Sequence, residues 1–300
     1  MVRLRDRRHK AAVVTAGEAG VVGQDTRNRP ERSQETEPSP TPDRERCALR
    51  VAVRTDQGRL RLRNEDAVLV DHERCVFAVA DGMGGHPAGD VASRVAVEHL
   101  PALIASALGS PLDAVGATLP KAAPGDVDAA LERALVELND VILAEAAQDP
   151  DHVGMGTTVV LALFTGLTAH VAHVGDSRAY LFRPGELHQL TEDDSLANAL
   201  IRGGVAPDDA RHHPYAERLT QAVGTAGGIQ PTVRGFELSA GDRLLLCSDG
   251  LTRMLVDARI GMILATEPDP EAASQALVDA ANHAGGEDNI SVVLIDVRDS

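Results

Sequence analysis

The chain has 300 residues and a formal net charge of −16, from 29 lysines and arginines against 45 aspartates and glutamates. Hydrophobic residues make up 43% of it and aromatic residues only 2%, so the chain can fold, with a core built from Ala, Val, Leu and Ile. The acidic balance and the shortage of aromatic side chains argue against a nucleic-acid partner, because nucleic acids bind to basic surfaces and stacking platforms.

The first 46 residues differ in composition from the rest of the chain. Four prolines, Pro30, Pro38, Pro40 and Pro42, lie there among Ser, Thr and Glu residues in a low-complexity stretch. Such a composition cannot bury enough apolar surface to fold, so we predict a disordered tail over residues 1–46. The basic start of this tail is not followed by the apolar run of a signal peptide.

Three features predict the compartment. The three cysteines are odd in number and widely spaced, which argues against a disulfide framework or a zinc site and favours a reducing compartment. The uncharged stretch 153–175 is broken by Gly166, so it predicts two strands joined by a turn rather than a membrane helix. The chain ends at Ser300, directly after the last predicted strand, and we therefore expect a cytoplasmic protein without a membrane partner.

From residue 48 onward, strand and helix patterns follow one another. Apolar runs predict strands at 48–54, 67–70, 75–80, 157–164, 168–174, 179–182, 187–190, 232–238, 243–248 and 290–297. Helices are predicted from about residue 88, with Pro101 kinking or dividing the helix, from a cap at Asp126, at 257–265, and from Asp269 to Gly285. Runs of strands interrupted by pairs of helices indicate an α+β fold with mainly antiparallel sheets.

A carboxylate lies at one end of four predicted strands. These residues are Asp81, Asp176, Asp249 and Asp288. Any one of them alone is typical of a turn. Four that converge would repel one another unless cations lay between them, and an oxygen-only ligand set suits Mg²⁺ or Mn²⁺ rather than Zn²⁺.

A segment upstream of these four aspartates carries both acidic and basic residues. Glu65 and Asp66 can accept hydrogen bonds from water bound to a metal. One of Arg59, Arg61 and Arg63 can clamp a phosphate, although their alternation also fits three solvated arginines on one face of an edge strand. The residues together predict an α+β enzyme that holds two or more divalent ions and hydrolyses a phosphate ester.

Seven motifs appear in a familiar order. They are RLRNED, VADGMGGHPAGDVAS, GMGTT, HVGDSRAYL, LTEDDS, LLCSDGL and GGEDNISVVL. Over residues 48–298 the chain resembles the metal-dependent serine/threonine protein phosphatases of the protein phosphatase 2C (PPM) family, bacterial type. The resemblance implies a sandwich of two mainly antiparallel β-sheets flanked by pairs of α-helices, in a catalytic domain over residues 47–300. It also implies that the polar segment at about 195–217 is a small flap beside the active site.

The resemblance also implies a set of metal ligands. Asp81 matches the carboxylate that bridges two catalytic ions, and Gly82 matches the residue whose carbonyl binds one of them. Asp249 and Asp288 match the remaining ligands of this pair. Asp176 matches the ligand of a third ion, shared with Asp249, so the expected cofactors are two Mn²⁺ or Mg²⁺ ions with a third as an option.

Other matched residues would handle the substrate. Arg61 matches the phosphate-binding arginine, and Glu65 and Asp66 match the acidic pair that supports metal-bound waters. Met83 follows the Asp-Gly pair where animal members have a His, a proposed general acid. The proton donor is therefore open, and the nearby His86 fits a turn-stabilising role better.

The implied activity is hydrolysis of phosphoserine and phosphothreonine in proteins, by attack of a hydroxide that bridges the two ions. The expected partners are phosphoproteins, including a bacterial serine/threonine kinase and its substrates, and the chain is expected to be a monomer. Two alternatives keep the same fold. One is a pseudophosphatase, and the other is a regulatory binding module dedicated to one phosphoprotein.

Overall fold

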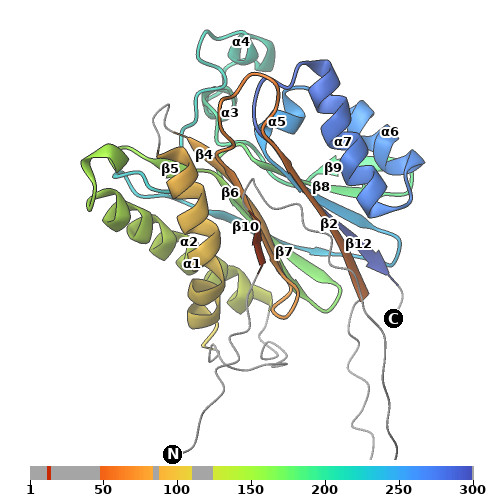
Figure 1. The fold of residues 1–300 in the computed structure, drawn as a ribbon, viewed down its shortest axis with the longest axis horizontal. Coiled ribbons are helices and arrows are strands. Elements are labelled where there is room, and N and C mark those ends of the chain that lie inside the picture. The colour runs from red at the N-terminus through yellow and green to blue at the C-terminus, as the bar shows by residue number, and fades with distance from the viewer. Residues whose placement is uncertain (1–11, 15–47, 84–87, 110–123, 299–300) are drawn as a thin grey trace, which may run out of the picture.

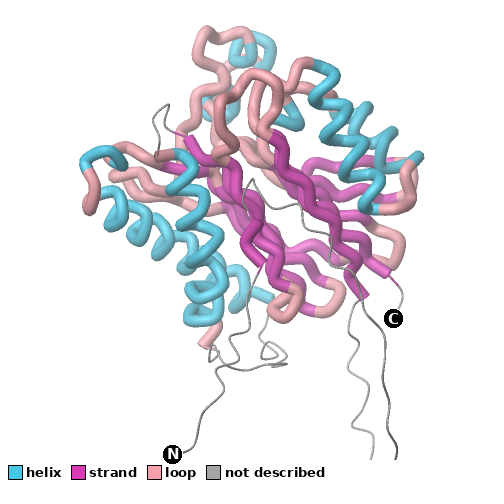
Figure 2. The backbone as a smooth tube through the Cα atoms, in the orientation of Figure 1, coloured by secondary structure: helices cyan, strands magenta, loops and turns pink. Residues whose placement is uncertain are grey.

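The computed structural model describes residues 12–14, 48–83, 88–109 and 124–298. Two antiparallel β-sheets stack face to face, and helices cover the outer face of each sheet (Figure 1, Figure 2). This arrangement confirms the predicted α+β sandwich. Almost every residue along the central strands is apolar and buried, because both faces of each sheet are covered.

The first sheet has the strand order β1-β3-β4-β6-β7-β10, and β5 pairs with β4. Its strands are β1 (Ala12–Val14), β3 (Asp66–Asp71), β4 (Val76–Met83), β5 (Gly156–Thr157), β6 (Val159–Thr165), β7 (Thr168–Val174) and β10 (Thr232–Glu237). Helices α1 (Gly89–Ala107) and α2 (Pro124–Ala146) pack on its outer face. The stretch 153–175 thus contains strands joined by a turn at Gly166, as predicted.

The second sheet has the strand order β2-β12-β11-β8-β9. Its strands are β2 (Ala48–Asp56), β8 (Arg178–Arg183), β9 (Glu186–Gln189), β11 (Arg243–Cys247) and β12 (Ile290–Arg298). Helices α5 (Asp249–Thr252), α6 (Asp257–Thr266) and α7 (Pro270–Ala284) belong to this half of the sandwich. Asp269 caps α7 by accepting a hydrogen bond from the Ala272 backbone N–H at 3.1 Å.

Alternation along β4 shows how one strand serves two cores. Phe77 and Val79 point between the sheets, where Leu244 and other side chains of the second sheet meet them. Ala78 and Ala80 point the other way, under the first pair of helices. Successive side chains of a strand point to opposite faces of the sheet. A continuous apolar run therefore contributes both to the core between the sheets and to the core under the helices.

Several sequence predictions need correction. Helix α1 runs through Pro101 without dividing, and Asp126 lies inside the first turn of α2 rather than at its cap. Residues 59–63 lie in the loop between β2 and β3, not in a strand, so alternation does not place the three arginines on one strand face. Helix α5 and the short 3₁₀ helix η1 (Pro150–His152) were not predicted.

Two other predicted segments can be compared with the structure. The expected flap contains α3 (Leu196–Arg202) and α4 (Pro207–Arg211). Within the predicted disordered tail, residues 12–14 form β1, which pairs with β3, and the remainder of that tail lies outside the described residues. His86 also lies outside them. Among the helices in the described ranges, none has the length and apolarity to cross a membrane.

The core between the sheets can be tested at Phe77, a fully buried side chain whose ring lies 5.8 Å from that of Phe164. Replacing Phe77 by Ala should lower the free energy of unfolding by about 3–5 kcal/mol, because a cavity opens between the sheets. Urea unfolding followed by circular dichroism measures this loss. Leu167→Ala, at a side chain that is 43% exposed in the β6–β7 turn, is the control and should change it by less than about 0.5 kcal/mol. Equal losses in the two variants would contradict this core.

Candidate active site

The pairing of β3 with β4 places two carboxylates opposite each other. Asp66 is in register with Asp81 at the end of the first sheet. The Asp66 side chain is buried, and its Oδ2 accepts a hydrogen bond of 2.8 Å from Oγ of Ser248, which directly follows β11 of the second sheet. The Asp81 backbone is held by Thr158, whose N–H donates to the Asp81 carbonyl at 2.9 Å and whose Oγ1 accepts from the Asp81 N–H at 3.2 Å.

Three more aspartates approach this pair from separate connections. Asp249 opens α5 directly after β11, Asp288 precedes β12, and Asp176 lies between β7 and β8. The pKa of Asp81 is raised well above its ordinary range, first by burial and then by the negative charges of the other four aspartates. The structure therefore brings together all five aspartates that the sequence singled out.

The same causes act on the neighbours of Asp81. Burial, together with Asp249 and Asp288, raises the pKa of Asp66 to about 7. Burial and Asp249 raise the pKa of Asp176 to about 7 as well. Burial likewise raises the pKa of Glu65, which precedes Asp66. Each of these carboxylates resists ionisation because water is excluded and other carboxylates are close.

Two glycines follow site aspartates because the backbone there is crowded. A Cβ atom on Gly82 would lie 2.1 Å from the carbonyl oxygen of Gly89, at the start of α1. A Cβ on Gly250 would lie 2.0 Å from the carbonyl oxygen of Asn289. The Asp-Gly pairs in the sequence thus mark places where a carboxylate-bearing strand end packs directly on another backbone segment.

Arg61 reaches the site from the β2–β3 loop. Its Nη2 lies 2.6 Å from Asp288 Oδ2, and its side chain remains 47% exposed. Burial lowers the pKa of Arg61, but the hydrogen bond to Asp288 and the negative charges around the guanidinium together raise it above its ordinary value. Of the three arginines in this loop, Arg61 is the one that the structure places against a site carboxylate.

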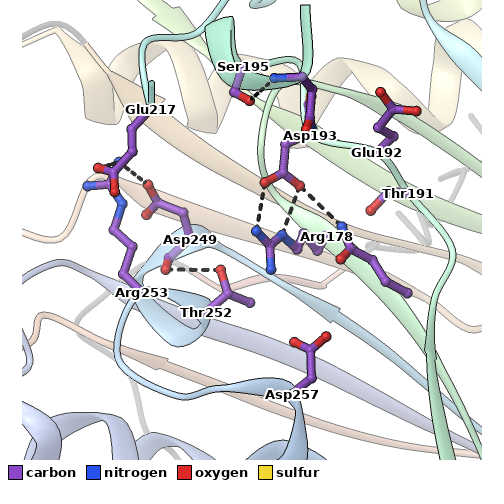
Figure 3. A network of polar contacts seen from close by, with 12 residues as sticks. Arg178, Thr191, Glu192, Asp193, Ser195, Glu217, Asp249, Thr252, Arg253 and Asp257 are labelled. Carbon is purple, nitrogen blue, oxygen red and sulfur yellow. Dashed lines mark hydrogen bonds and ion pairs between the residues drawn. The ribbon is translucent and has the colours of Figure 1, made fainter. Parts of the chain in front are cut away.

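Arg253 is a site residue that the sequence analysis missed. Its Nη2 lies 2.9 Å from Asp249 Oδ2 and its Nη1 lies 3.7 Å from Asp288 Oδ2. Nη2 is also 3.9 Å from Glu217 Oε2, at the end of the flap (Figure 3). Arg253 follows Asp249 by four residues, the spacing of one helical turn, so a helix predicted at Asp249 would have revealed it.

The flap is anchored next to Asp176. Asp193 receives two hydrogen bonds from Arg178, one from Nε at 2.8 Å and one from Nη2 at 2.7 Å (Figure 3). The neighbouring Asp194 accepts a hydrogen bond of 3.0 Å from the Gly175 N–H. Both contacts flank Asp176 in sequence, so the base of the flap is fixed to the strand connection that carries this carboxylate.

The donor set fits a hard divalent cation. Asp66 Oδ1 and Asp249 Oδ1 are buried and have no hydrogen-bond partner, and carboxylate oxygens are the ligands such ions prefer. Within the described part of the chain, however, no three His, Cys, Asp or Glu side chains are already arranged to hold an ion. Arg61 and Arg253 supply positive charge to Asp288 and Asp249 instead, so ion binding requires these side chains to shift.

Comparison with known proteins gives this arrangement a family. The family model described as "Protein phosphatase 2C" matches residues 57–284, which include every candidate site residue except Asp288. The chain belongs to the protein phosphatase 2C family.

Curated relatives support this assignment. The chain is 39% identical over 254 residues to the serine/threonine protein phosphatase PstP of Mycobacterium tuberculosis, an alignment that covers 84% of this chain and 45% of PstP. It therefore spans less than half the length of that relative. It is 38% identical over 253 residues to the serine/threonine phosphatase stp of Listeria monocytogenes, covering 83% of this chain and 96% of stp.

A solved structure shows the same family fold with metal. The catalytic domain of PstP in complex with two manganese ions aligns with a TM-score of 0.68 and 36% identity, over 84% of this chain and 99% of that one. The sandwich of this protein phosphatase 2C member is thus shared with a relative whose structure holds two Mn²⁺ ions.

The raised pKa values of Asp66 and Asp176 make the stability of the protein pH-dependent. Without divalent ions, the folded state keeps protons that the unfolded chain releases near pH 4. This stabilisation is present at low pH and is lost as pH rises towards about 7. In EDTA, wild type should therefore lose more stability between pH 5 and pH 8 than Asp66→Asn, which cannot ionise. Urea unfolding at both pH values measures the difference, and an equal pH dependence in the two proteins would contradict it.

Arg253 should oppose metal binding while it stabilises the metal-free protein. Replacing it by Gln removes the positive charge beside Asp249, so the metal-free form should lose about 1 kcal/mol of stability. The rise in Tm on adding Mn²⁺ should be larger than in wild type, since the ion no longer competes with the guanidinium. Differential scanning fluorimetry with and without Mn²⁺ measures both effects. Arg259→Gln, on α6, is the control, and a smaller Mn²⁺-induced shift in Arg253→Gln would refute the competition.

Proposed function

We propose that this chain is a metal-dependent protein phosphatase that hydrolyses phosphoserine and phosphothreonine. The observation that carries the proposal is the meeting of five aspartates from both sheets, beside an arginine, at one end of the sandwich. Membership of the protein phosphatase 2C family and the names of the relatives support the same activity.

The proposed ligands of two catalytic ions are Asp81, the Gly82 carbonyl, Asp249 and Asp288. Asp176 would hold a third ion together with Asp249. Mn²⁺ or Mg²⁺ fits the oxygen donors, and the manganese complex of PstP favours Mn²⁺. When bound, such ions activate water and stabilise the charge on the phosphoryl group.

The protein's own side chains would orient the substrate. Arg61 has five N–H donors in a planar fork, which can bind two phosphoryl oxygens once the side chain leaves Asp288. Glu65 and Asp66 would accept hydrogen bonds from water at the site. Met83 has no proton to donate to the leaving seryl oxygen, and solvent is the simplest source of that proton.

The complete carboxylate set argues against a pseudophosphatase or a pure binding module. Either of these alternatives could dispense with Asp81, Asp249 or Asp288, yet all three are present and converge with Asp66. We propose that the enzyme acts in the cytoplasm as a monomer, on proteins phosphorylated by a serine/threonine kinase. The cysteine pattern supports a reducing compartment. The relatives' names as serine/threonine phosphatases support substrates that a serine/threonine kinase has phosphorylated.

Phosphate release from a phosphothreonine peptide tests the proposal. Wild type should turn the peptide over with Mn²⁺, and EDTA should abolish turnover. Asp81→Asn should lower kcat/KM by on the order of 10³-fold, because a central charge at the reacting group is lost. Asp279→Asn, at an exposed position on α7, is the control and should retain wild-type turnover. Full Mn²⁺-dependent turnover by Asp81→Asn would overturn the assignment.

A further inference from the structure

The loop between β2 and β3 exposes apolar side chains beside the candidate site. Leu62 is 95% exposed and Leu60 is 68% exposed, although both residues are typical of protein interiors. They alternate with Arg59, Arg61 and Arg63, whose side chains are also exposed. We refer to residues 59–63 as the RLRLR loop. A single exposed leucine needs no explanation, but two on one short loop, interleaved with arginines, form a surface of mixed character.

The RLRLR loop is held rigidly. Asn289 Nδ2 donates hydrogen bonds to the carbonyls of Gln57 at 2.9 Å and Arg63 at 2.8 Å, which closes the loop at its two ends. The Arg59 N–H donates to the Gly286 carbonyl at 2.6 Å. Gly58 has φ +76° and packs so closely on the Asp288 carbonyl that a Cβ atom would lie 2.1 Å from it. The leucines are therefore presented on a preorganised backbone, which lowers the entropy cost of binding a partner.

Two of the three arginines in the loop, Arg59 and Arg63, form no ion pair within the described residues, whereas Arg61 contacts Asp288. Arg63 is nevertheless close enough to Glu65 for its charge to oppose the burial that raises the pKa of that carboxyl. This positive surface lies on a chain of net charge −16. The charges of Arg59 and Arg63 are complementary to an acidic or phosphorylated partner.

The position of the loop indicates which partner it meets. It lies at the same end of the sandwich as the flap helices α3 and α4 (Figure 1). Leu60 and Leu62 are the immediate neighbours of Arg61, the residue placed for the phosphoryl group. Consecutive Cα atoms are only about 3.8 Å apart, so a bound polypeptide would meet the leucines within two or three residues of its phosphorylated side chain.

We propose that the RLRLR loop is the docking surface for the polypeptide that flanks the phosphorylated residue. It selects substrates with an apolar side chain, which packs on Leu60 and Leu62, and an acidic side chain, which pairs with Arg59 or Arg63. This inference rests on the proposed phosphatase function and names its substrate class.

The test compares two phosphothreonine peptides with p-nitrophenyl phosphate, which has no flanking residues. One peptide carries Leu and Glu within three residues of phosphothreonine, and the other carries Ala and Lys there. Wild type should prefer the first peptide. The double variant Leu60→Asn/Leu62→Asn should lower kcat/KM for the first peptide by about 5- to 20-fold. This is the loss expected when two leucines that the bound peptide would partly bury are removed. Turnover of p-nitrophenyl phosphate should stay within twofold of wild type.

The charged half of the surface is tested separately. Arg59→Gln/Arg63→Gln should lower kcat/KM for the first peptide by about 3- to 10-fold and leave the second peptide unaffected or improved. The preference for the first peptide should also weaken at 0.5 M salt, because exposed charges are screened. Leu167→Asn and Arg234→Gln, in the β6–β7 turn and on the edge strand β10, are matched controls and should behave as wild type.

A binding measurement separates failure of docking from failure of the proposed function. Fluorescence anisotropy of the labelled first peptide on Asp81→Asn protein, with and without the leucine substitutions, reports docking without turnover. Loss of peptide binding on substituting the leucines supports the proposal even in an inactive protein. Equal binding and an unchanged peptide preference would overturn it. Sedimentation provides a second way to overturn it. If wild type were a dimer that Leu60→Asn/Leu62→Asn dissociates while the peptide preference stayed unchanged, the surface would serve self-association instead.

Discussion

The repulsion among buried carboxylates is the constraint on which this structure depends. Asp66, Asp81, Asp249 and Asp288 meet where water is largely excluded, so they cannot all be ionised without nearby positive charge. Three sources of positive charge are available: protons retained through raised pKa values, the guanidinium groups of Arg61 and Arg253, and divalent cations. The guanidinium groups contact Asp288 and Asp249, burial and mutual repulsion favour retained protons, and divalent cations are what the donor chemistry suits best. Repulsion among the carboxylates destabilises such a site, and a bound cation stabilises it.

The fold supports this arrangement because each sheet contributes part of the charge and the two sheets are joined beside it. Ser248 follows β11 and donates a hydrogen bond to Asp66 of β3, and the Glu65 N–H donates to Asn289 Oδ1 at 2.8 Å, just before β12. These bonds cross from one sheet to the other next to the carboxylates. Without them, repulsion could be relieved by separation of the sheet ends, so polar cross-links at this edge complement the apolar core between the sheets.

The sequence predicted the fold and the carboxylates better than their partners. The aspartates could be predicted because they adjoin apolar strand runs or precede glycines. Both of these patterns are local in the sequence. Arg253 was missed because α5 has only four residues, too few to show a helical period. Residues 59–63 alternate as a strand would, yet they form a loop because Gly58 adopts a positive φ and Asn289, more than 200 residues away, binds the backbone at both loop ends. Contacts this distant in sequence leave no local pattern.

The same constraint explains how a protein of net negative charge can present positive charge at one site. At physiological ionic strength the Debye length is about 8 Å, so most of the surface carboxylates that give the net charge of −16 are screened from a ligand at the site. The local field is set by the groups within that distance. Arg61 and Arg253 partly offset the site carboxylates, and Arg59 and Arg63 add positive charge at the rim. Positive charge is thus concentrated at this rim of the site. Divalent ions held by the carboxylates would free Arg61 and Arg253 from Asp288 and Asp249, so the positive charge of these two arginines would become available to an anionic ligand.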